Sequence, residues 1–234
     1  MDSKKSEGMK IRILPEGPYE VVGGVPLNQA IIVPDTDGAG AEWKGGKSYQ
    51  PADEPYHLCR CGHSGNKPYC DGQHKMIKFV GLEVADKTPY EEVAERYEGK
   101  TMDLLDQRSL CAVARFCDRF DGVWELAVNG VTKDERDIAV YEACCCPSGR
   151  LTIVKKNGEK IEPPLECEIS VVQDPATGHK GPLWVKGGIK IEGSDGEEYE
   201  TRNRVTLCRC GQSSNMPFCD SSHLNCTHME GMDK

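Results

Sequence analysis

The sequence lacks the features that would place the protein in a membrane or outside the cell. No apolar run approaches the ~18 residues that a membrane-spanning helix needs, so we expect no membrane partner. Residues 1–8 are polar, and neither an apolar stretch nor a small-residue cleavage site follows them. That pattern predicts no secretory signal, and we therefore expect a cytoplasmic protein.

Basic residues are also scarce, because 29 Lys and Arg stand against 38 Asp and Glu, a formal net charge of −9. Sequence-independent binding to nucleic acid depends on Lys and Arg that neutralise phosphates, so we expect no nucleic-acid partner. The sequence has no Walker loop, no Rossmann glycine fingerprint after a strand and no nucleophile elbow. We therefore expect no enzyme activity of its own, although the chain fits an electron-transfer component of an oxidoreductase.

Cysteine, by contrast, is abundant, with 13 in the chain. A reducing cytosol gives disulfides little chance to persist. Disulfide pairing would also leave one cysteine over and would not explain the histidines near the others. Metal binding is the better explanation.

Part of the sequence occurs twice. Residues 17–27 and 181–191 are similar, and each stretch predicts a strand, a Gly-Gly turn and a second strand. Leu-Cys-Arg-Cys-Gly follows in both copies, at 58–62 and 207–211. The first copy carries an insertion rich in Gly and Asp at 35–48, which we expect to be a surface loop.

The unit between the copies opens with a predicted helix. Thr88 to Glu91 form a capping box with Pro at the first helical position, and helical spacing continues through Tyr97 to a stop at Gly99. A second capping box, Thr132 to Glu135, predicts a helix that leads to three consecutive cysteines. A strand, an Asn157-Gly158 turn and a return strand follow at 151–162.

Both repeats end in the pattern C-x-C-x2-S-x3-P-x-C-D-x2-H. Alternate residues of a straight strand point to opposite faces, so Cys-x-Cys grips one metal centre only where the backbone curls, and a glycine follows each pair. Four residues separate the third Cys from the His, which predicts that both lie on one face of a helix. The Asp is expected to cap this helix and the Ser hydroxyl to donate to the centre. The candidate ligands and their neighbours are Cys59, Cys61, Ser64, Cys70, Asp71 and His74 in the first copy and Cys208, Cys210, Ser213, Cys219, Asp220 and His223 in the second.

These two segments resemble the CDGSH iron-sulfur family, the mitoNEET-like proteins. The resemblance implies two 2Fe-2S clusters, each bound by three Cys and one His. Gln73 and Ser221 depart from the family pattern, but they lie between ligands and affect fine geometry only. A structural zinc site is the alternative, since three Cys and one His also form a tetrahedral zinc set, although zinc prefers Cys-x2-Cys knuckles. The implied ligands are Cys59, Cys61, Cys70 and His74, and Cys208, Cys210, Cys219 and His223.

The middle unit resembles a divergent single-cluster ferredoxin. Cys111 and Cys117 are followed by a distant Cys146-Pro147, and Ala114 stands where the motif has its middle Cys. The resemblance implies a third cluster, 3Fe-4S or 4Fe-4S, on these three cysteines, with Cys144 or Cys145 as a substitute fourth ligand. The alternative is a ferredoxin-shaped domain that has lost its metal and keeps its cysteines as small buried hydrophobes.

Three further residues, Arg60, Arg209 and Cys226, lie close to the predicted ligands in the sequence. Arg60 and Arg209 either temper the charge of a cluster or are simply solvated in exposed loops. Cys226, three residues after His223, is expected to be a spare thiol close to the end of the chain.

We therefore expect an α+β protein with a β-rich module at 1–82, a ferredoxin-like α+β segment at 83–165 and a second β-rich module at 166–234. The resemblance further suggests that the outer modules pair within the chain as a pseudo-dimer. A His ligand raises the reduction potential above that of an all-Cys cluster and can be protonated. We expect transfer of electrons or clusters to redox or cluster-acceptor proteins, with a redox- or iron-sensing interaction module as the alternative function.

Overall fold

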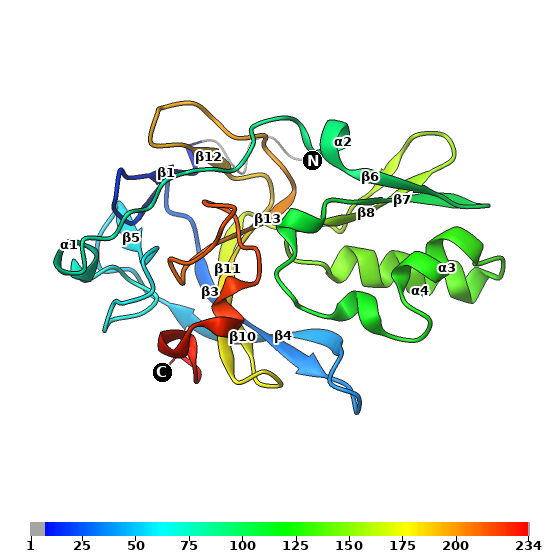
Figure 1. Cartoon of the computed structure of the whole chain (residues 1–234), viewed down its shortest axis with the longest axis horizontal. Coiled ribbons are helices and arrows are strands. Elements are labelled where there is room, and N and C mark those ends of the chain that lie inside the picture. The colour runs from blue at the N-terminus through cyan, green and yellow to red at the C-terminus, as the bar shows by residue number, and fades with distance from the viewer. Residues whose placement is uncertain (1–7, 234) are drawn as a thin grey trace.

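The computed structural model describes residues 8–233 (Figure 1). Strands from both ends of this chain build one four-stranded sheet, in the order β12-β1-β2-β5. β1 pairs in parallel with β12, which places Ile11 opposite Ile191, and the other pairs are antiparallel. The strands of this sheet are β1 (Lys10–Ile13), β2 (Tyr19–Val22), β5 (Tyr56–Leu58) and β12 (Lys190–Glu192).

A five-stranded sheet, in the order β13-β11-β10-β3-β4, also combines strands from both repeats. β3 and β10 run parallel at its centre, with Leu27 opposite Ile169. The two sheets pack their apolar faces together into one core, to which both repeats contribute. The strands are β3 (Leu27–Pro34), β4 (Gly40–Tyr49), β10 (Glu168–Asp174), β11 (His179–Lys186) and β13 (Arg204–Leu207).

The predicted strands on either side of each Gly-Gly pair are confirmed, but the pair is a corner between sheets. β2 and β3 flank Gly23-Gly24, and they belong to different sheets, as do β11 and β12 around Gly187-Gly188. All four glycines have φ between 66° and 88°, a left-handed conformation that other residues adopt only with strain. Each corner sends the chain from one sheet to the other, so strands of the two repeats become neighbours.

The prediction of a surface loop at 35–48 is wrong for most of its length. Only the turn is a loop, in which the Asp35 carboxylate accepts hydrogen bonds from the amides of Asp37 and Ala39. Residues from Gly40 onward form β4, which pairs antiparallel with β3 as the edge of the five-stranded sheet. The backbone hydrogen bonds of this pairing outweigh the low strand propensity of the glycines.

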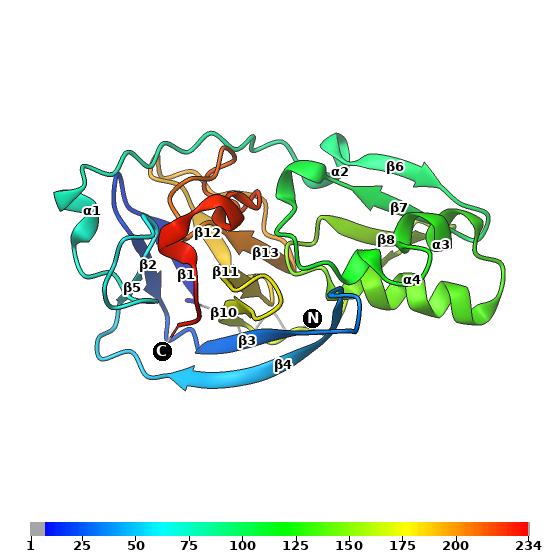
Figure 2. The ribbon, with the colours of Figure 1, turned by 60° about the horizontal axis from the view of Figure 1, so that its bottom comes forward.

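The middle unit has its own four-stranded antiparallel sheet, β6-β7-β8-β9, with α3 and α4 on one face (Figures 1 and 2). The predicted hairpin is confirmed as β8 and β9, and the predicted capping box at Thr132 and Glu135 begins α4. Apolar residues of the sheet and both helices form a separate core. The elements are β6 (Glu95–Glu98), β7 (Met102–Asp106), α3 (Val123–Asn129), α4 (Lys133–Cys145), β8 (Leu151–Lys155) and β9 (Lys160–Ile161).

The helix predicted after Thr88 is wrong beyond its first turn, because α2 (Tyr90–Val93) gives way to β6. Thr88 does not cap it, since its hydroxyl donates to Asp86. Tyr97 instead pairs with Leu104 of β7. Here pairing with a neighbouring strand overrides a local helical pattern.

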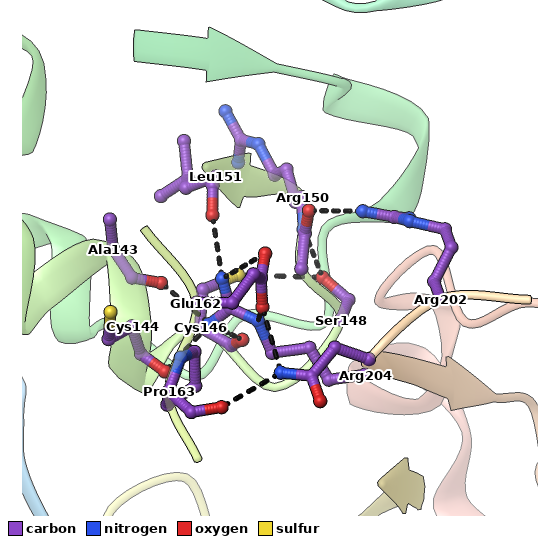
Figure 3. A network of polar contacts seen from close by, with 12 residues as sticks. Ala143, Cys144, Cys146, Ser148, Arg150, Leu151, Glu162, Pro163, Arg202 and Arg204 are labelled. Atoms are coloured by element: carbon purple, nitrogen blue, oxygen red, sulfur yellow. Dashed lines mark hydrogen bonds and ion pairs between the residues drawn. The ribbon is translucent and has the colours of Figure 1, made fainter. Parts of the chain in front are cut away.

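The middle unit packs against the five-stranded sheet through aromatic rings and buried ion pairs. Trp43 lies between Phe116 and Trp184, with ring centroids 5.0 and 4.7 Å away. Arg204 of β13, which is 1% exposed, reaches into the middle unit and binds the end of α4 (Figure 3).

These sheets and helices confirm the predicted α+β class. Among the described residues no helix is long and apolar enough to cross a membrane.

Candidate metal centres

The first repeat brings its four predicted ligands together as two pairs. Cys59 follows β5, and its Sγ lies 3.9 Å from Sγ of Cys61. Cys70 lies in the turn before α1 (Gln73–Met76), and its Sγ is 3.3 Å from Nδ1 of His74.

The second repeat has the same arrangement. Cys208 follows β13, and its Sγ lies 3.5 Å from Sγ of Cys210. Sγ of Cys219 is 3.5 Å from Nδ1 of His223, which lies in the short 3-10 helix η3 (Ser222–Asn225).

The distances within each pair fit two ligands of one tetrahedral metal ion. With metal–sulfur bonds near 2.3 Å and metal–nitrogen bonds near 2.0 Å, two such sulfurs lie about 3.8 Å apart, and a sulfur and a nitrogen about 3.5 Å apart. Among residues 8–233, no group of three or more His, Cys, Asp or Glu side chains is placed to hold a single ion. The donors therefore fit a centre with two metal ions, one for each pair, better than one zinc ion held by all four.

The local structure around these ligands differs from the predicted helix. Cys70 and Cys219 precede the short helices and do not lie on them. The carboxylate of Asp71 accepts hydrogen bonds from the amides of Gln73 and Gly65, so it ties the start of α1 to the loop after Cys61. Asp220 does the same with Ser222 and Ser214. Each Asp thus joins two parts of its ligand loop by hydrogen bonds. A turn, and not a continuous helix, brings the His close to its Cys.

The predicted role of the serine hydroxyls is wrong. The hydroxyl of Ser64 donates to the carbonyl of Tyr69 at 2.6 Å, and that of Ser213 donates to Phe218 at the same distance. Both hydroxyls thus donate their hydrogen bonds within the ligand loop and stabilise it. The backbone amides of the two serines, and not the hydroxyls, favour the thiolate of the first cysteine.

The first cysteine of each repeat is poised as a thiolate. The neighbouring Cys61 thiol donates a hydrogen bond to Cys59 and lowers its pKa to about 6, and backbone amides act in the same direction. Cys210 likewise lowers the pKa of Cys208 to about 7. The thiolate is the form of cysteine that binds a metal, so this arrangement favours ligation near neutral pH.

Burial keeps both histidines in the form that binds a metal. It lowers the pKa of His74, and it lowers the pKa of His223 to about 4, with Arg209 acting in the same direction. A neutral imidazole is required of a metal ligand. Both repeats therefore present three sulfur donors and one neutral nitrogen.

The two ligand loops lie directly against each other. A Cβ atom on Gly62 would lie 2.5 Å from the carbonyl oxygen of Cys210, and one on Gly211 would lie 2.6 Å from that of Cys61. Both glycines have φ near 80°. Only glycine permits both this conformation and this close approach. The two ligand loops can therefore lie against each other only because each has a glycine at this position.

Arg60 and Arg209 are not solvated, because they are 1% and 2% exposed. Arg60 donates to the carbonyls of Leu14 and Gly81, and Arg209 forms a buried ion pair with Asp233 at 2.7 Å. Cys226 is a free thiol, as expected, but it is buried. Its side chain is 7% exposed and packs in one apolar cluster with the Cys-x-Cys pairs of both repeats, next to Met229.

Two contacts at the ligand loops were not foreseen from the sequence. The buried hydroxyl of Tyr19 donates to the carbonyl of Cys208 at 2.7 Å. The ring of His228 stacks on His63, and its Nε2 lies 2.9 Å from the carbonyl oxygen of Cys210. Both contacts join residues of the two repeats, which no local pattern could have indicated.

The three predicted ligands of the middle unit line one cavity of about 190 Å³. Cys111, Cys117 and Cys146 all contribute to its wall, and so does Ala114, while Cys144 and Cys145 do not. The carbonyl of Cys145 instead accepts a hydrogen bond from Trp43. The structure thus brings three cysteines together and leaves the two substitutes elsewhere.

The loop around this cavity has an unusual backbone. Val113 and Arg115, on either side of Ala114, have φ of 52° and 61°. A left-handed β-branched residue is strained, and such strain is concentrated at functional sites. Loops with left-handed residues turn their amides inward and bind anions, iron-sulfur clusters among them. The cavity is therefore suited to an anionic cluster.

Comparison with known protein families matches residues 16–75 and 180–224 to the iron-binding zinc finger CDGSH type. Residues 97–156 match the divergent 4Fe-4S mono-cluster family. The chain is an iron-sulfur protein with two CDGSH-type segments that flank a divergent 4Fe-4S segment. The resemblances predicted from the ligand motifs and the middle cysteines are thereby confirmed. Comparisons with curated proteins and with solved structures gave no match.

The two CDGSH sites of this iron-sulfur protein differ in exposure. Cys219 and His223 of the second site are 3% and 4% exposed. Cys70 and His74 of the first site are only half-buried. The ligand motifs are alike, so the difference arises from what the rest of the chain packs over each His.

Proposed function

We propose that the protein is a redox carrier with a 2Fe-2S cluster at each CDGSH site. The arrangement of each site as a Cys-Cys pair and a Cys-His pair carries this proposal. Each pair has the spacing of two ligands on one tetrahedral metal, as two linked irons require. A bound 2Fe-2S cluster supplies one-electron chemistry.

The middle cavity extends the proposal to a third cluster, 3Fe-4S or 4Fe-4S, on Cys111, Cys117 and Cys146. Three thiols at one cavity and a strained loop with left-handed residues support it. Ala114 supplies no fourth sulfur, so either a 3Fe-4S cluster or a 4Fe-4S cluster with one iron free of cysteine fits the wall.

Contacts between the sites support transfer of electrons from one to the next. The side chain of Asn215, in the second CDGSH loop, donates to the carbonyl of Ser109, beside Cys111. Burial raises the pKa of Cys219, and Cys111 is near enough to contribute to this effect. The second CDGSH loop contacts the first through Gly62 and Gly211. The three sites thus form a row, with the second CDGSH site in the middle.

Shared sheets support the further proposal that the two CDGSH modules form an intramolecular pseudo-dimer. The parallel pairs β1–β12 and β3–β10 each join one strand from each repeat. This exchange makes the spacing between the two CDGSH sites a fixed property of one chain. A carrier of this kind acts on redox or cluster-acceptor proteins and needs no substrate pocket of its own.

Anaerobic purification with quantification of iron, sulfide and zinc, combined with EPR of the oxidised and reduced protein, tests the proposal. Two 2Fe-2S clusters give about four irons per chain, and the middle cluster raises this to about seven or eight. The variant Cys111→Ser should lose the additional irons and keep the four, while Cys59→Ser should lose two. Stoichiometric zinc without sulfide would contradict the proposal.

A further inference from the structure

The segment that follows His74 exposes an apolar surface beside the first CDGSH site. It carries five of the ten large apolar side chains that are exposed within the described residues, all with exposed fractions between 41% and 78%. Single exposed apolar side chains are normal, but a contiguous group marks an interaction site. The five are Met76, Ile77, Val80, Leu82 and Val84, and we call them the apolar stripe.

The stripe belongs to a firmly held segment. Between α1 and α2 the chain runs along the outside of the molecule (Figure 2). Alternate residues of this segment hold it to the rest of the protein. Phe79 is buried, the carbonyl of Gly81 accepts a hydrogen bond from Arg60, and Glu83 accepts one from the hydroxyl of Tyr199. Val80, Leu82 and Val84 alternate with these residues and are exposed to solvent, while Met76 ends α1 and Ile77 is its C-cap.

The fold itself does not require this exposure, because the second CDGSH site has no such surface. Cys226 stands three residues after His223, as Ile77 stands three residues after His74. Cys226 is 7% exposed and Met229 is fully buried. The same position is thus covered by the chain itself in one repeat and open in the other.

Charge around the stripe indicates what covers it. Lys75 and Lys78 are exposed within it, on a chain whose net charge is −9. Two copies that paired stripe to stripe would bring these lysines together, which disfavours a second copy as the occupant. An acidic partner with an apolar contact area suits the surface instead.

We propose that residues 75–84 form the docking surface for an acidic electron-transfer protein, and that electrons enter at the first CDGSH site. This rests on the proposed redox function. The half-buried His74 lies immediately beside the stripe, whereas His223 is 4% exposed. In each encounter the partner is oxidised by one electron and the first CDGSH site is reduced by one.

Stopped-flow mixing with a reduced plant-type 2Fe-2S ferredoxin, an acidic protein of lower potential than a His-ligated cluster, tests the proposal. The variants are Val80→Ser/Leu82→Ser and Lys75→Glu/Lys78→Glu. Each should lower the second-order rate constant by about tenfold at low salt. The rate constant of the wild-type protein should fall as salt increases, and charge reversal should abolish this dependence. The control Val131→Ser alters a valine that is as exposed as Val84, at 59%, and should leave the rate unchanged.

The variant Cys59→Ser, which lacks the first cluster, should lose the rapid phase of reduction, and a rapid phase that persists in this variant would overturn entry at the first site. Equal rates for both stripe variants and the wild-type protein, with clusters intact, would overturn the docking surface but not the redox function. Lack of clusters in the wild-type protein would instead overturn the redox function. A salt-independent wild-type rate, or a stable dimer that the Val80→Ser/Leu82→Ser variant dissolves in sedimentation experiments, would also overturn the proposal.

Discussion

Replacing Arg204 with Met should destabilise the protein because it removes the guanidinium that joins β13 to the middle unit (Figure 3). The side chain is 1% exposed, so water does not replace its hydrogen bonds. Its Nε lies 3.0 Å from a carboxylate oxygen of Glu162. It also donates at 2.6–3.1 Å to four carbonyl oxygens, those of Ala143, Cys144, Cys146 and Leu151.

The size of the effect follows from these contacts. Removing the buried partner of a charged, hydrogen-bonded network costs about 3–5 kcal/mol, since carbonyl groups that Arg204 binds lose a buried donor. Glu162, at 25% exposed, keeps water and Asn203 as partners and adds less. Met fills most of the aliphatic volume of Arg204, so little apolar burial is lost. In a domain of 150–250 residues each kcal/mol shifts the melting temperature by about 2–4 °C, which predicts a decrease of about 6–20 °C.

Thermal unfolding followed by circular dichroism, on the protein with its metal centres filled, measures this decrease. Arg96→Met is the matched control, because it breaks a 2.8 Å ion pair with Asp103 in which the Arg96 side chain is 45% exposed. Asp103 is buried but keeps its ion pair with Lys156, and an ion pair with an exposed Arg contributes less than about 1 kcal/mol, so the control should shift the midpoint by only a few degrees. If Arg204→Met and the control shifted the midpoint equally, the reasoning from buried hydrogen bonds would be refuted.

Three further predictions concern the sites and their surroundings. Gly62→Ala should lower the free energy of unfolding in urea by more than about 2 kcal/mol, because alanine is strained in the left-handed conformation and its Cβ would clash with the Cys210 carbonyl. Gly72 has φ of 90° but open space around it, so Gly72→Ala should lower the free energy of unfolding by the strain alone. Burial raises the pKa of Glu142 to about 8, and its carboxylate oxygens have no hydrogen-bond partner among the described residues. The folded state therefore keeps a proton that the unfolded state loses near pH 4.3, so stability falls from there to about pH 8, and Glu142→Gln should remove this slope. His74→Cys and His223→Cys should each lower the potential of their own cluster and flatten its dependence on pH in EPR-monitored titrations; an unchanged curve would contradict ligation by that His.

The ligand pairs could be predicted from the sequence because most of the forces that form them are local. Asp71 binds the amide of Gly65, and Ser64 binds the carbonyl of Tyr69, all within the ligand loop itself. The capping box of α4 and the Asn157-Gly158 turn are local in the same sense, and both predictions are confirmed. The errors arose where a distant partner competes with a local preference, as when Tyr97 pairs with β7.

The sequence by itself determined the ligand types, their spacing and the duplication, since these depend on residue chemistry and short-range turns. Tertiary structure alone decided that the repeats exchange strands at their Gly-Gly corners. It likewise decided that Cys111 and Cys117 line one cavity with Cys146, although α3 and α4 lie between them in the sequence. It also decided that His223 is buried while His74 borders an exposed apolar stripe. The reason is that the burial of a residue depends on which distant segments pack over it. The two ligand motifs are nearly identical, so they do not indicate which of the two histidines becomes buried.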